Sequence, residues 1–252
     1  MQRKLIRKLQ PLERYLPMFV RRMLRRAFQR PLPVGGVRLG DLRSTVPVDP
    51  WFGYSRGQPL DRFYIEAFLA AHASDIHGAV LEIGDDEYTR CFGGDRVTNS
   101  SVFHVSADNP KATYVGDLAA ASHVPSGHFD CVVLTQTLHL IYDFQSALST
   151  LERILRPGGV LLLTVPGITP VDPGEWRSTW YWAFTEVAVN RMLAESFGTE
   201  PAVRSHGNVL VATGFLQGLA TSELTPAELA AQDPAYPIVV TARVQKKPSN
   251  PA

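Results

Sequence analysis

Residues that could bind a ligand follow the first short apolar run of this sequence. Residues 79–83 are mostly apolar, and they end at Gly84, after which an acidic cluster begins at Asp85. A glycine at that place lets the backbone turn sharply and approach a ligand closely. The carboxylate of Glu82 could accept hydrogen bonds from a ligand. The pattern predicts a site for a cationic or hydroxylated group at the end of this run.

Acidic residues also follow the next two apolar runs. Asp108 comes shortly after residues 102–105, and Asp117 and Leu118 come after residues 112–115. An acid behind the second strand of an open α/β sheet can bind both hydroxyls of a ribose. These positions therefore extend the predicted site toward a nucleoside-like ligand.

Gln136 and His139 follow the apolar run at residues 129–134. An imidazole with an ordinary pKa of about 6.5 can take the proton from a hydroxyl group, so His139 is the candidate general base. The alternative is a histidine that is packed at the start of the next helix and held there by a hydrogen bond. The sequence leaves both interpretations open.

The densest aromatic segment of the chain spans residues 176–185. Aromatic side chains there could wall an apolar or sugar-like acceptor. We expect Trp176 and Trp180 near the pocket and Trp182 and Phe184 in the core, with a helix starting just beyond them.

Apolar runs of strand length alternate with helical patterns along most of the chain. Such alternation predicts an α/β fold, a Rossmann-like doubly wound sheet of seven mostly parallel strands. Ligands bind such sheets beyond the carboxyl ends of the strands, which is where the polar residues above fall. The predicted strands are 79–83, 102–105, 112–115, 129–134, 160–165, 203–206 and 237–244, and the predicted helices are 61–73, 143–155, 185–197 and one from 209.

Four short motifs, in this order and spacing, resemble those of class I S-adenosylmethionine-dependent methyltransferases. They are Leu-Glu-Ile-Gly at 81–84, Gly-Asp-Leu at 116–118, Phe-Asp at 129–130 and Leu-Arg-Pro-Gly-Gly-Val-Leu at 155–161. The chain is more narrowly similar to small bacterial methyltransferase-domain proteins of sugar or natural-product biosynthesis, over about residues 51–245. The resemblance implies S-adenosylmethionine as cofactor and an antiparallel C-terminal strand.

The resemblance also implies roles for single residues at the cofactor. Glu82 and Gly84, with Asp85 in the same loop, would lie beside the methionine part. Asp108, or in its place Ser106, would take the ribose-binding position.

Five further residues receive implied roles. Asp117 and Leu118 would flank the adenine, and Gln136 would lie beneath the cofactor. Tyr64 and Arg56 would cover the methionine end, where the Arg56 guanidinium could pair with the cofactor carboxylate.

The loop after residues 79–83 departs from the family pattern. The usual loop has glycines at alternate positions, whereas here Asp86 and Tyr88 occupy the two places after Gly84. The acidic loop would repel the pyrophosphate of a dinucleotide, which disfavours an NAD site. A sulfonium cofactor without phosphate tolerates it.

The composition limits the classes of partner. The chain has 252 residues, of which 45% are apolar and 19% charged, as in an ordinary globular protein. Its two cysteines, Cys91 and Cys131, imply no disulfide framework, and no Cys/His set suggests a metal. Basic residues are scattered between residues 31 and 252, so no nucleic-acid partner is expected. We expect a cytoplasmic protein.

The N-terminal 30 residues are strongly basic. They hold ten basic residues and one acidic residue, a charge of +9, which leaves −8 for the other 222 residues because the whole chain carries +1. Residues 12–28 have the spacing of an amphipathic helix. Such an arm could pack on the rest of the chain, on a second copy in a homo-oligomer, or on an anionic membrane surface, which would make the protein peripheral at the membrane. Neither a transmembrane run nor a secretory signal is recognised.

The sequence therefore predicts a helical arm and connection at 1–58, a methyltransferase domain at 59–247 and a tail at 248–252. The expected activity is methyl transfer to a hydroxyl of a small molecule, a natural product or a sugar. Two other hypotheses stay open: a different reaction on the same fold, such as a cyclisation, and a non-catalytic binding partner.

Overall fold

The computed structural model describes residue 32 and residues 34–248. The predicted helix at 12–28 and the end of the tail lie outside these residues. The chain divides into two compact units, Met1–Thr45 and Val46–Ala252, so the connection at 46–58 belongs with the second unit. The described part of the first unit contains the short 3₁₀ helix Gly40–Leu42. Within the described residues, no helix is long and apolar enough to cross a membrane.

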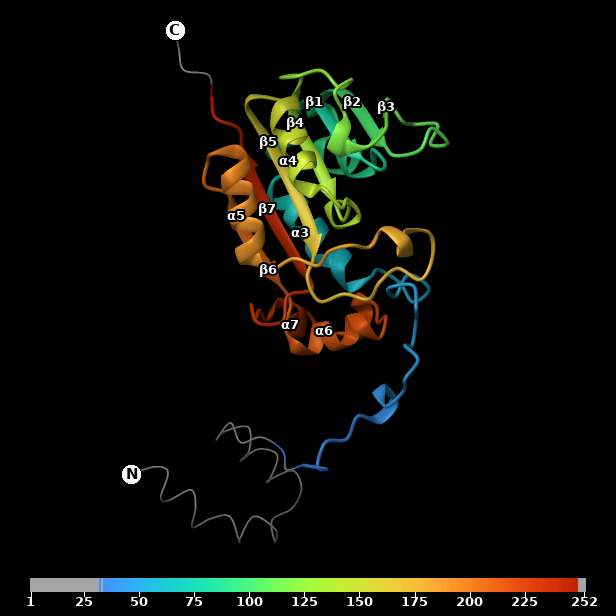
Figure 1. Cartoon of the computed structure of the whole chain (residues 1–252). Coiled ribbons are helices and arrows are strands. Elements are labelled where there is room, and N and C mark those ends of the chain that lie inside the picture. Colours follow the sequence, from blue (N-terminus) through green and yellow to red (C-terminus); the bar gives the residue numbers. More distant parts are fainter. Residues whose placement is uncertain (1–31, 33, 249–252) are drawn as a thin grey trace, which may run out of the picture. The chain divides into compact units, whose positions relative to one another are not determined.

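Seven strands of the second unit form one sheet in the order β3-β2-β1-β4-β5-β7-β6 (Figure 1). β1 runs parallel to β2 and β4, β3 is parallel to β2, and β5 is parallel to β4, whereas β7 is antiparallel to both β5 and β6. The predicted mostly parallel sheet with its antiparallel C-terminal strand is confirmed. The strands are β1 Gly78–Ile83, β2 Val97–His104, β3 Tyr114–Val115, β4 Phe129–Thr135, β5 Leu155–Pro166, β6 Ala202–His206 and β7 Val239–Gln245.

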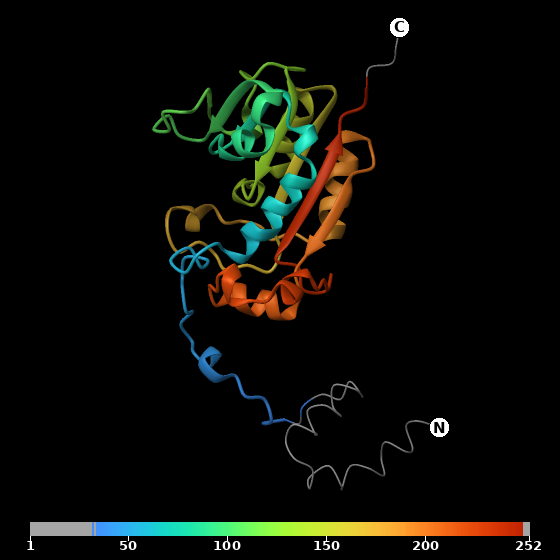
Figure 2. The same ribbon diagram turned by 180° about the vertical axis from the view of Figure 1, so that it is seen from behind.

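Helices cover both faces of the sheet, as Figures 1 and 2 show. Successive residues of the central strands point to opposite faces, so Leu81 packs with α4 and α5 while Val80 packs with α3 and α6. Burying each such side chain contributes about 1.5–3 kcal/mol. The helices of the second unit are α3 Leu60–Ala71, α4 Phe144–Ile154, α5 Glu186–Phe197, α6 Val209–Leu216 and α7 Pro226–Ala230.

Side chains at the helix starts explain where α4, α5 and α6 begin. The Asp143 carboxylate accepts from the Ser146 backbone N–H at 3.0 Å, and the Thr185 hydroxyl accepts from the Ala188 N–H at 3.2 Å. The Asn208 side chain does the same for the first turn of α6. Each cap satisfies a backbone donor that has no partner inside the helix. The predicted starts at 143, 185 and 209 are therefore close to those found.

Residues 46–58 form a strap that is fixed against the loop after α6. The Asp49 N–H donates to the Gln217 carbonyl at 3.0 Å. The two segments touch so closely that a Cβ on Gly53 would lie 2.9 Å from the Leu219 carbonyl oxygen. Only a glycine allows this approach. The contact places the aromatic residues of the strap beside the carboxyl ends of the strands.

Candidate active site

A cavity of about 1150 Å³ opens at the carboxyl ends of β1 and β4. Small-molecule sites usually measure roughly 300–1,000 Å³, so this one is large for a ligand site. Its walls come from the ends of the central strands, from the strap at 46–58 and from the aromatic segment at 176–181. No cluster of three or more metal-ligating side chains occurs in the described part of the chain.

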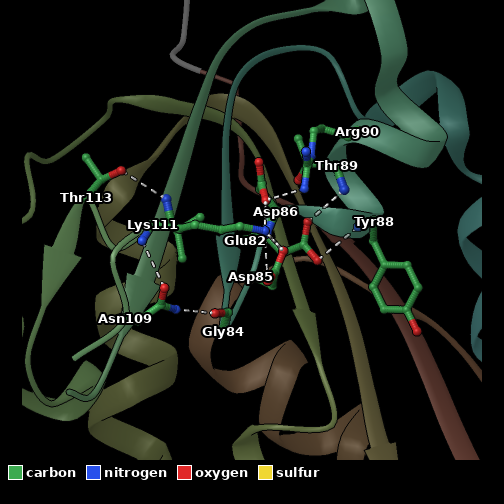
Figure 3. A network of polar contacts seen from close by, with 11 residues as sticks. Glu82, Gly84, Asp85, Asp86, Tyr88, Thr89, Arg90, Asn109, Lys111 and Thr113 are labelled. Carbon is green, nitrogen blue, oxygen red and sulfur yellow. Dashed lines mark hydrogen bonds and ion pairs between the residues drawn. The ribbon is translucent and has the colours of Figure 1, made fainter. Parts of the chain in front are cut away.

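Glu82 lies at the end of β1, on the cavity wall, and is 3% exposed. Its carboxylate accepts from the backbone N–H groups of Thr89 at 2.7 Å and Tyr88 at 3.3 Å (Figure 3). Burial raises the pKa of Glu82 to about 7 in spite of these bonds. Glu82 thus holds the loop after β1 in place as well as facing the cavity.

The acidic loop after β1 is held by residues that follow β2 (Figure 3). The Lys111 ammonium lies 3.0 Å from an Asp85 oxygen and 3.2 Å from an Asp86 oxygen. The Asn109 amide donates to the Gly84 carbonyl at 2.8 Å. The sequence does not signal a role for Asn109 and Lys111, because their contacts join two separate loops. Gly84 itself has φ +98°, a backbone conformation that residues other than glycine rarely adopt.

The predicted ribose acid, Asp108, does not line the cavity. It is exposed, and its carboxylate accepts from the Ser106 hydroxyl at 2.8 Å in a local turn. His104, the last residue of β2, lines the cavity instead, and its Nδ1 accepts from the Ser106 N–H at 3.0 Å. We do not retain Asp108 as a cofactor-binding residue. His104 was not predicted from the sequence, although its place at the end of β2 is the kind of position at which ligands bind.

Asp117 and Leu118 both line the cavity. Asp117 precedes a short 3₁₀ helix, Leu118–Ala120, and one of its carboxylate oxygens accepts from the Ala119 N–H at 2.8 Å. Leu118 is 3% exposed and packs in the core. The pair presents a carboxylate next to an apolar surface, which suits the predicted adenine contact. That role stays a prediction.

Gln136 lies just past β4 in a strained conformation, with φ +43°. Among the described residues, Gln136 and Phe52 are the two non-glycine residues with positive φ, and both line the cavity. Such strain costs about 1–3 kcal/mol per residue and tends to occur at functional sites. The Gln136 Nε2 amide is buried and has no hydrogen-bond partner within the described residues. A ligand acceptor is expected at this amide, because an unpaired buried donor costs about 1–3 kcal/mol.

His139 lines the cavity and is 1% exposed. Its ring packs against Trp180 with centroids 4.2 Å apart, and its carbonyl accepts from the N–H groups of Tyr181 and Trp182. Neither ring nitrogen has a hydrogen-bond partner in the described part of the protein. Burial lowers the pKa of His139 to about 3, so the imidazole is neutral near neutral pH. The ring is packed and also faces the cavity, but within the described residues it lacks the hydrogen bond that the packed-histidine interpretation expected.

The aromatic segment divides between the cavity and the core. Trp176 and Trp180 line the cavity, and Trp180 stacks on Phe52 of the strap with centroids 6.0 Å apart. Phe184 is 6% exposed in the core, and the Trp182 indole donates to the Ile141 carbonyl at 3.1 Å. The residues therefore lie where the sequence analysis placed them.

Two residues predicted to cover the cofactor lie outside the cavity lining. Tyr64 is buried in the core, and its hydroxyl donates to the Leu229 carbonyl at 2.8 Å. The Arg56 guanidinium pairs with the Glu223 carboxylate, which joins the strap to the segment after α6. We do not retain either as a cofactor-binding residue. No local pattern signals these partners, which are 165 and 167 residues away along the chain.

Comparison with known proteins agrees with this geometry. Residues 77–163, which include β1, β2, β3, β4 and most of β5, match the family profile described as a methyltransferase domain. This match and the fold together support a class I S-adenosylmethionine-dependent methyltransferase. S-adenosylmethionine is the cofactor of this family.

The curated relatives include two ubiquinone/menaquinone biosynthesis C-methyltransferases. The protein from Pseudomonas fluorescens is 26% identical over 152 residues, which is 56% of this chain and 54% of that protein. The one from Pasteurella multocida is 33% identical over 115 residues, which is 41% of this chain and 42% of that protein. The chain thus spans about half the length of these relatives.

Solved structures share the fold at low sequence identity. A methyltransferase from Mesorhizobium loti has a TM-score of 0.53 and 15% identity, with 74% of this chain and 100% of that chain covered. The cyclase SpnF has a TM-score of 0.50 and 15% identity, with 82% and 88% covered. Proteins described by different reactions therefore share this architecture, and the reaction has to be argued from the site.

The residues around the cavity fit an S-adenosylmethionine molecule. Its sulfonium is a cation, and carboxylates such as Glu82 and Asp85 lie on the wall at the end of β1. The unpaired Gln136 amide supplies a donor for a ligand oxygen. The space beside the Gly84 Cα is open, because a Cβ built there would meet nothing within 4 Å.

Proposed function

We propose that this protein transfers a methyl group from S-adenosylmethionine to a hydroxyl of a small molecule, and that His139 accepts the hydroxyl proton. The observation that carries the proposal is a pair of buried, unpaired polar side chains, Gln136 and His139, in one cavity. Gln136 suits a contact with the cofactor, and His139 suits a contact with the methyl acceptor. The natural-product or sugar nature of the acceptor is part of the proposal.

The cofactor would be held by the strand-end half of the cavity. The residues we assign to it are Glu82, Gly84, Asp85, Asp117, Leu118 and Gln136, all of which line the cavity. When bound, the cofactor supplies a methyl group on a positively charged sulfur. The protein's own contribution is to bring the acceptor oxygen in line with that methyl group, and such orientation accounts for a large share of the barrier in two-substrate reactions.

The acceptor hydroxyl would donate a hydrogen bond to one ring nitrogen of His139. Formation of the oxygen–methyl bond would be balanced by loss of the sulfur–methyl bond, whose electron pair the cofactor sulfur would keep. The O–H group of the methylated oxygen is strongly acidic, so its proton passes to the imidazole even though the pKa of His139 is about 3 in the buried site. A neutral imidazole is required at the start, and the low pKa ensures it.

Methylation of carbon is the second candidate, because the relatives from Pseudomonas fluorescens and Pasteurella multocida are C-methyltransferases by name. A hydroxyl on an unsaturated ring makes the neighbouring ring carbon nucleophilic. As that carbon took the methyl group, the hydroxyl would become strongly acidic and its proton would pass to His139, and the methylated carbon would then lose its own proton to water to restore the ring. NMR of the product distinguishes the two, since an O-methyl and a C-methyl group have different proton shifts.

Calorimetric titration with S-adenosylmethionine and S-adenosylhomocysteine tests the cofactor site. We expect Asp117→Ala to weaken binding at least tenfold, a loss of about 1.4 kcal/mol. Asp108→Ala is the matched control, because its carboxylate is exposed and outside the lining. Equal affinity of the two variants would remove Asp117 from the site.

Turnover measurements test the reaction. His139→Ala should lower the rate of S-adenosylhomocysteine release much more than it lowers cofactor affinity. Full activity of this variant would exclude His139 as the proton acceptor. Conversion of an acceptor without S-adenosylhomocysteine release would favour a reaction such as cyclisation, and absence of cofactor binding by the folded protein would favour a non-catalytic partner.

A further inference from the structure

The two halves of the cavity differ in chemistry. The half at the strand ends carries acidic and amide side chains, whereas the half between the strap and the segment at 176–181 carries most of the aromatic ones. Trp180 and Phe52 stack there with an angle of 15° between their planes, so the pair offers a flat ring face to the cavity. Tyr54 and Tyr181 extend the aromatic lining and are 56% and 46% exposed. Aromatic side chains of this kind favour contact with another flat ring.

The charge of the cavity is strongly one-sided. Among the described residues, eight carboxylate side chains line it against a single guanidinium, that of Arg62. Arg62 is already engaged, because it lies 4.0 Å from the Asp61 carboxylate and donates to the Tyr54 hydroxyl at 3.0 Å. An anionic acceptor would enter a negative field without a free cation to pair with, which is costly in a partly desolvated site.

His139 stands at the inner end of the aromatic half, in contact with Trp180. A neutral imidazole offers one hydrogen-bond donor and one acceptor. A hydroxyl group has the same combination, so it can pair with either ring nitrogen, whereas a carboxylate only accepts and an ammonium only donates. The unpaired, 1% exposed histidine is therefore best matched by a hydroxyl group.

From these three observations we infer that the methyl acceptor is a flat ring that carries a hydroxyl group and no negative charge, and that acidic analogues of it are rejected. The inference rests on the proposed methyl transfer and narrows its substrate class. The ring would lie against the Trp180–Phe52 pair with its hydroxyl on His139. Either the oxygen or the adjacent ring carbon would then be within reach of methylation.

Binding of naphthalene derivatives to the full chain tests this class. The probes are naphthol, naphthoate and naphthalene, each titrated by calorimetry near neutral pH in the presence of saturating S-adenosylhomocysteine, so that no turnover occurs. We expect naphthol to bind at least tenfold more tightly than each of the other two. Naphthoate binding as tightly as naphthol would overturn the rejection of acidic acceptors.

Variants test separately the ring contact with Trp180 and the hydroxyl contact with His139. Trp180→Ala should weaken naphthol binding at least tenfold, and Trp180→Phe, which keeps a flat ring and the packing, should retain most of it. Tyr236→Ala is the control, because Tyr236 is 40% exposed and lies outside the lining. His139→Leu should bind naphthol and naphthalene with about equal affinity, since this variant loses the polar contact to the hydroxyl group. An unchanged preference in His139→Leu would overturn the hydroxyl contact.

The experiment separates this inference from the function on which it rests. S-adenosylhomocysteine is titrated first, without a probe. If it binds and the naphthol preference is absent, the acceptor class is wrong while the cofactor site stands. If it does not bind and naphthol still does, the proposed methyl transfer fails while the ligand class of the aromatic half stands.

Discussion

Replacement of His139 by leucine tests the burial of this side chain by the pH dependence of stability. The folded protein lowers the pKa of His139 to about 3 from the ordinary 6.5, because burial disfavours the charged ring. The unfolded chain therefore binds the proton more strongly. The stability contribution of the neutral ring is complete above pH 6.5 and is lost as the pH falls from there toward 3. For one such group, the free energy of unfolding drops by about 2 kcal/mol between about pH 7.5 and pH 5.

The assay is urea unfolding of the wild type and His139→Leu at these two pH values, followed by circular dichroism. A leucine side chain cannot titrate, so the variant should lose about 2 kcal/mol less than the wild type on acidification. His206 gives a matched comparison, because burial also lowers its pKa, to about 4, and it lies outside the cavity lining. His206→Asn should likewise reduce the acid sensitivity, but it should leave the affinity for S-adenosylhomocysteine and naphthol unchanged.

The result that would refute this reasoning is the same loss of stability on acidification in the wild type and His139→Leu. It would mean that the folded protein does not lower the pKa of His139, and hence that the ring is hydrated or paired rather than buried and unpaired. The proposed proton acceptor and the inferred hydroxyl contact would both lose their basis.

Three further changes have expected outcomes. Gln136→Gly should leave the free energy of unfolding within about 1 kcal/mol of the wild type, because relief of the strain at φ +43° offsets the added backbone entropy, while calorimetry shows weaker cofactor binding. Glu82→Gln should remove a decline in stability of about 2 kcal/mol between about pH 5 and pH 7.5, measured by urea unfolding, since a raised pKa gives stability that is present below the ordinary 4.5 and lost as the pH rises through about 7. Arg56→Ala should not change cofactor affinity in calorimetry, because its guanidinium pairs with Glu223 outside the cavity lining; a tenfold loss would return it to the site.

The sequence alone predicted the order of strands and helices, because local signals determine it. Apolar runs such as 129–134 become central strands that are buried on both faces, and caps such as Thr185 begin helices. It also placed Glu82, Gly84 and Gln136 on the cavity wall, since residues just past parallel strands meet at one edge of the sheet. The polar first half of β2 was not predicted, because it has no apolar pattern. It is a strand because its backbone pairs with β1.

The tertiary structure decided which of the candidate residues reach the cavity. Tyr64 and Arg56 have the right chemistry, but partners far along the chain hold them elsewhere. The burial of His139 comes from packing against Trp180, which lies on a separate loop. Burial and long-range pairing depend on the packing of distant segments, and no local pattern records them. The sequence therefore determined the sheet and the edge at which the site lies, and only the folded chain decided which side chains, in which protonation state, face a ligand.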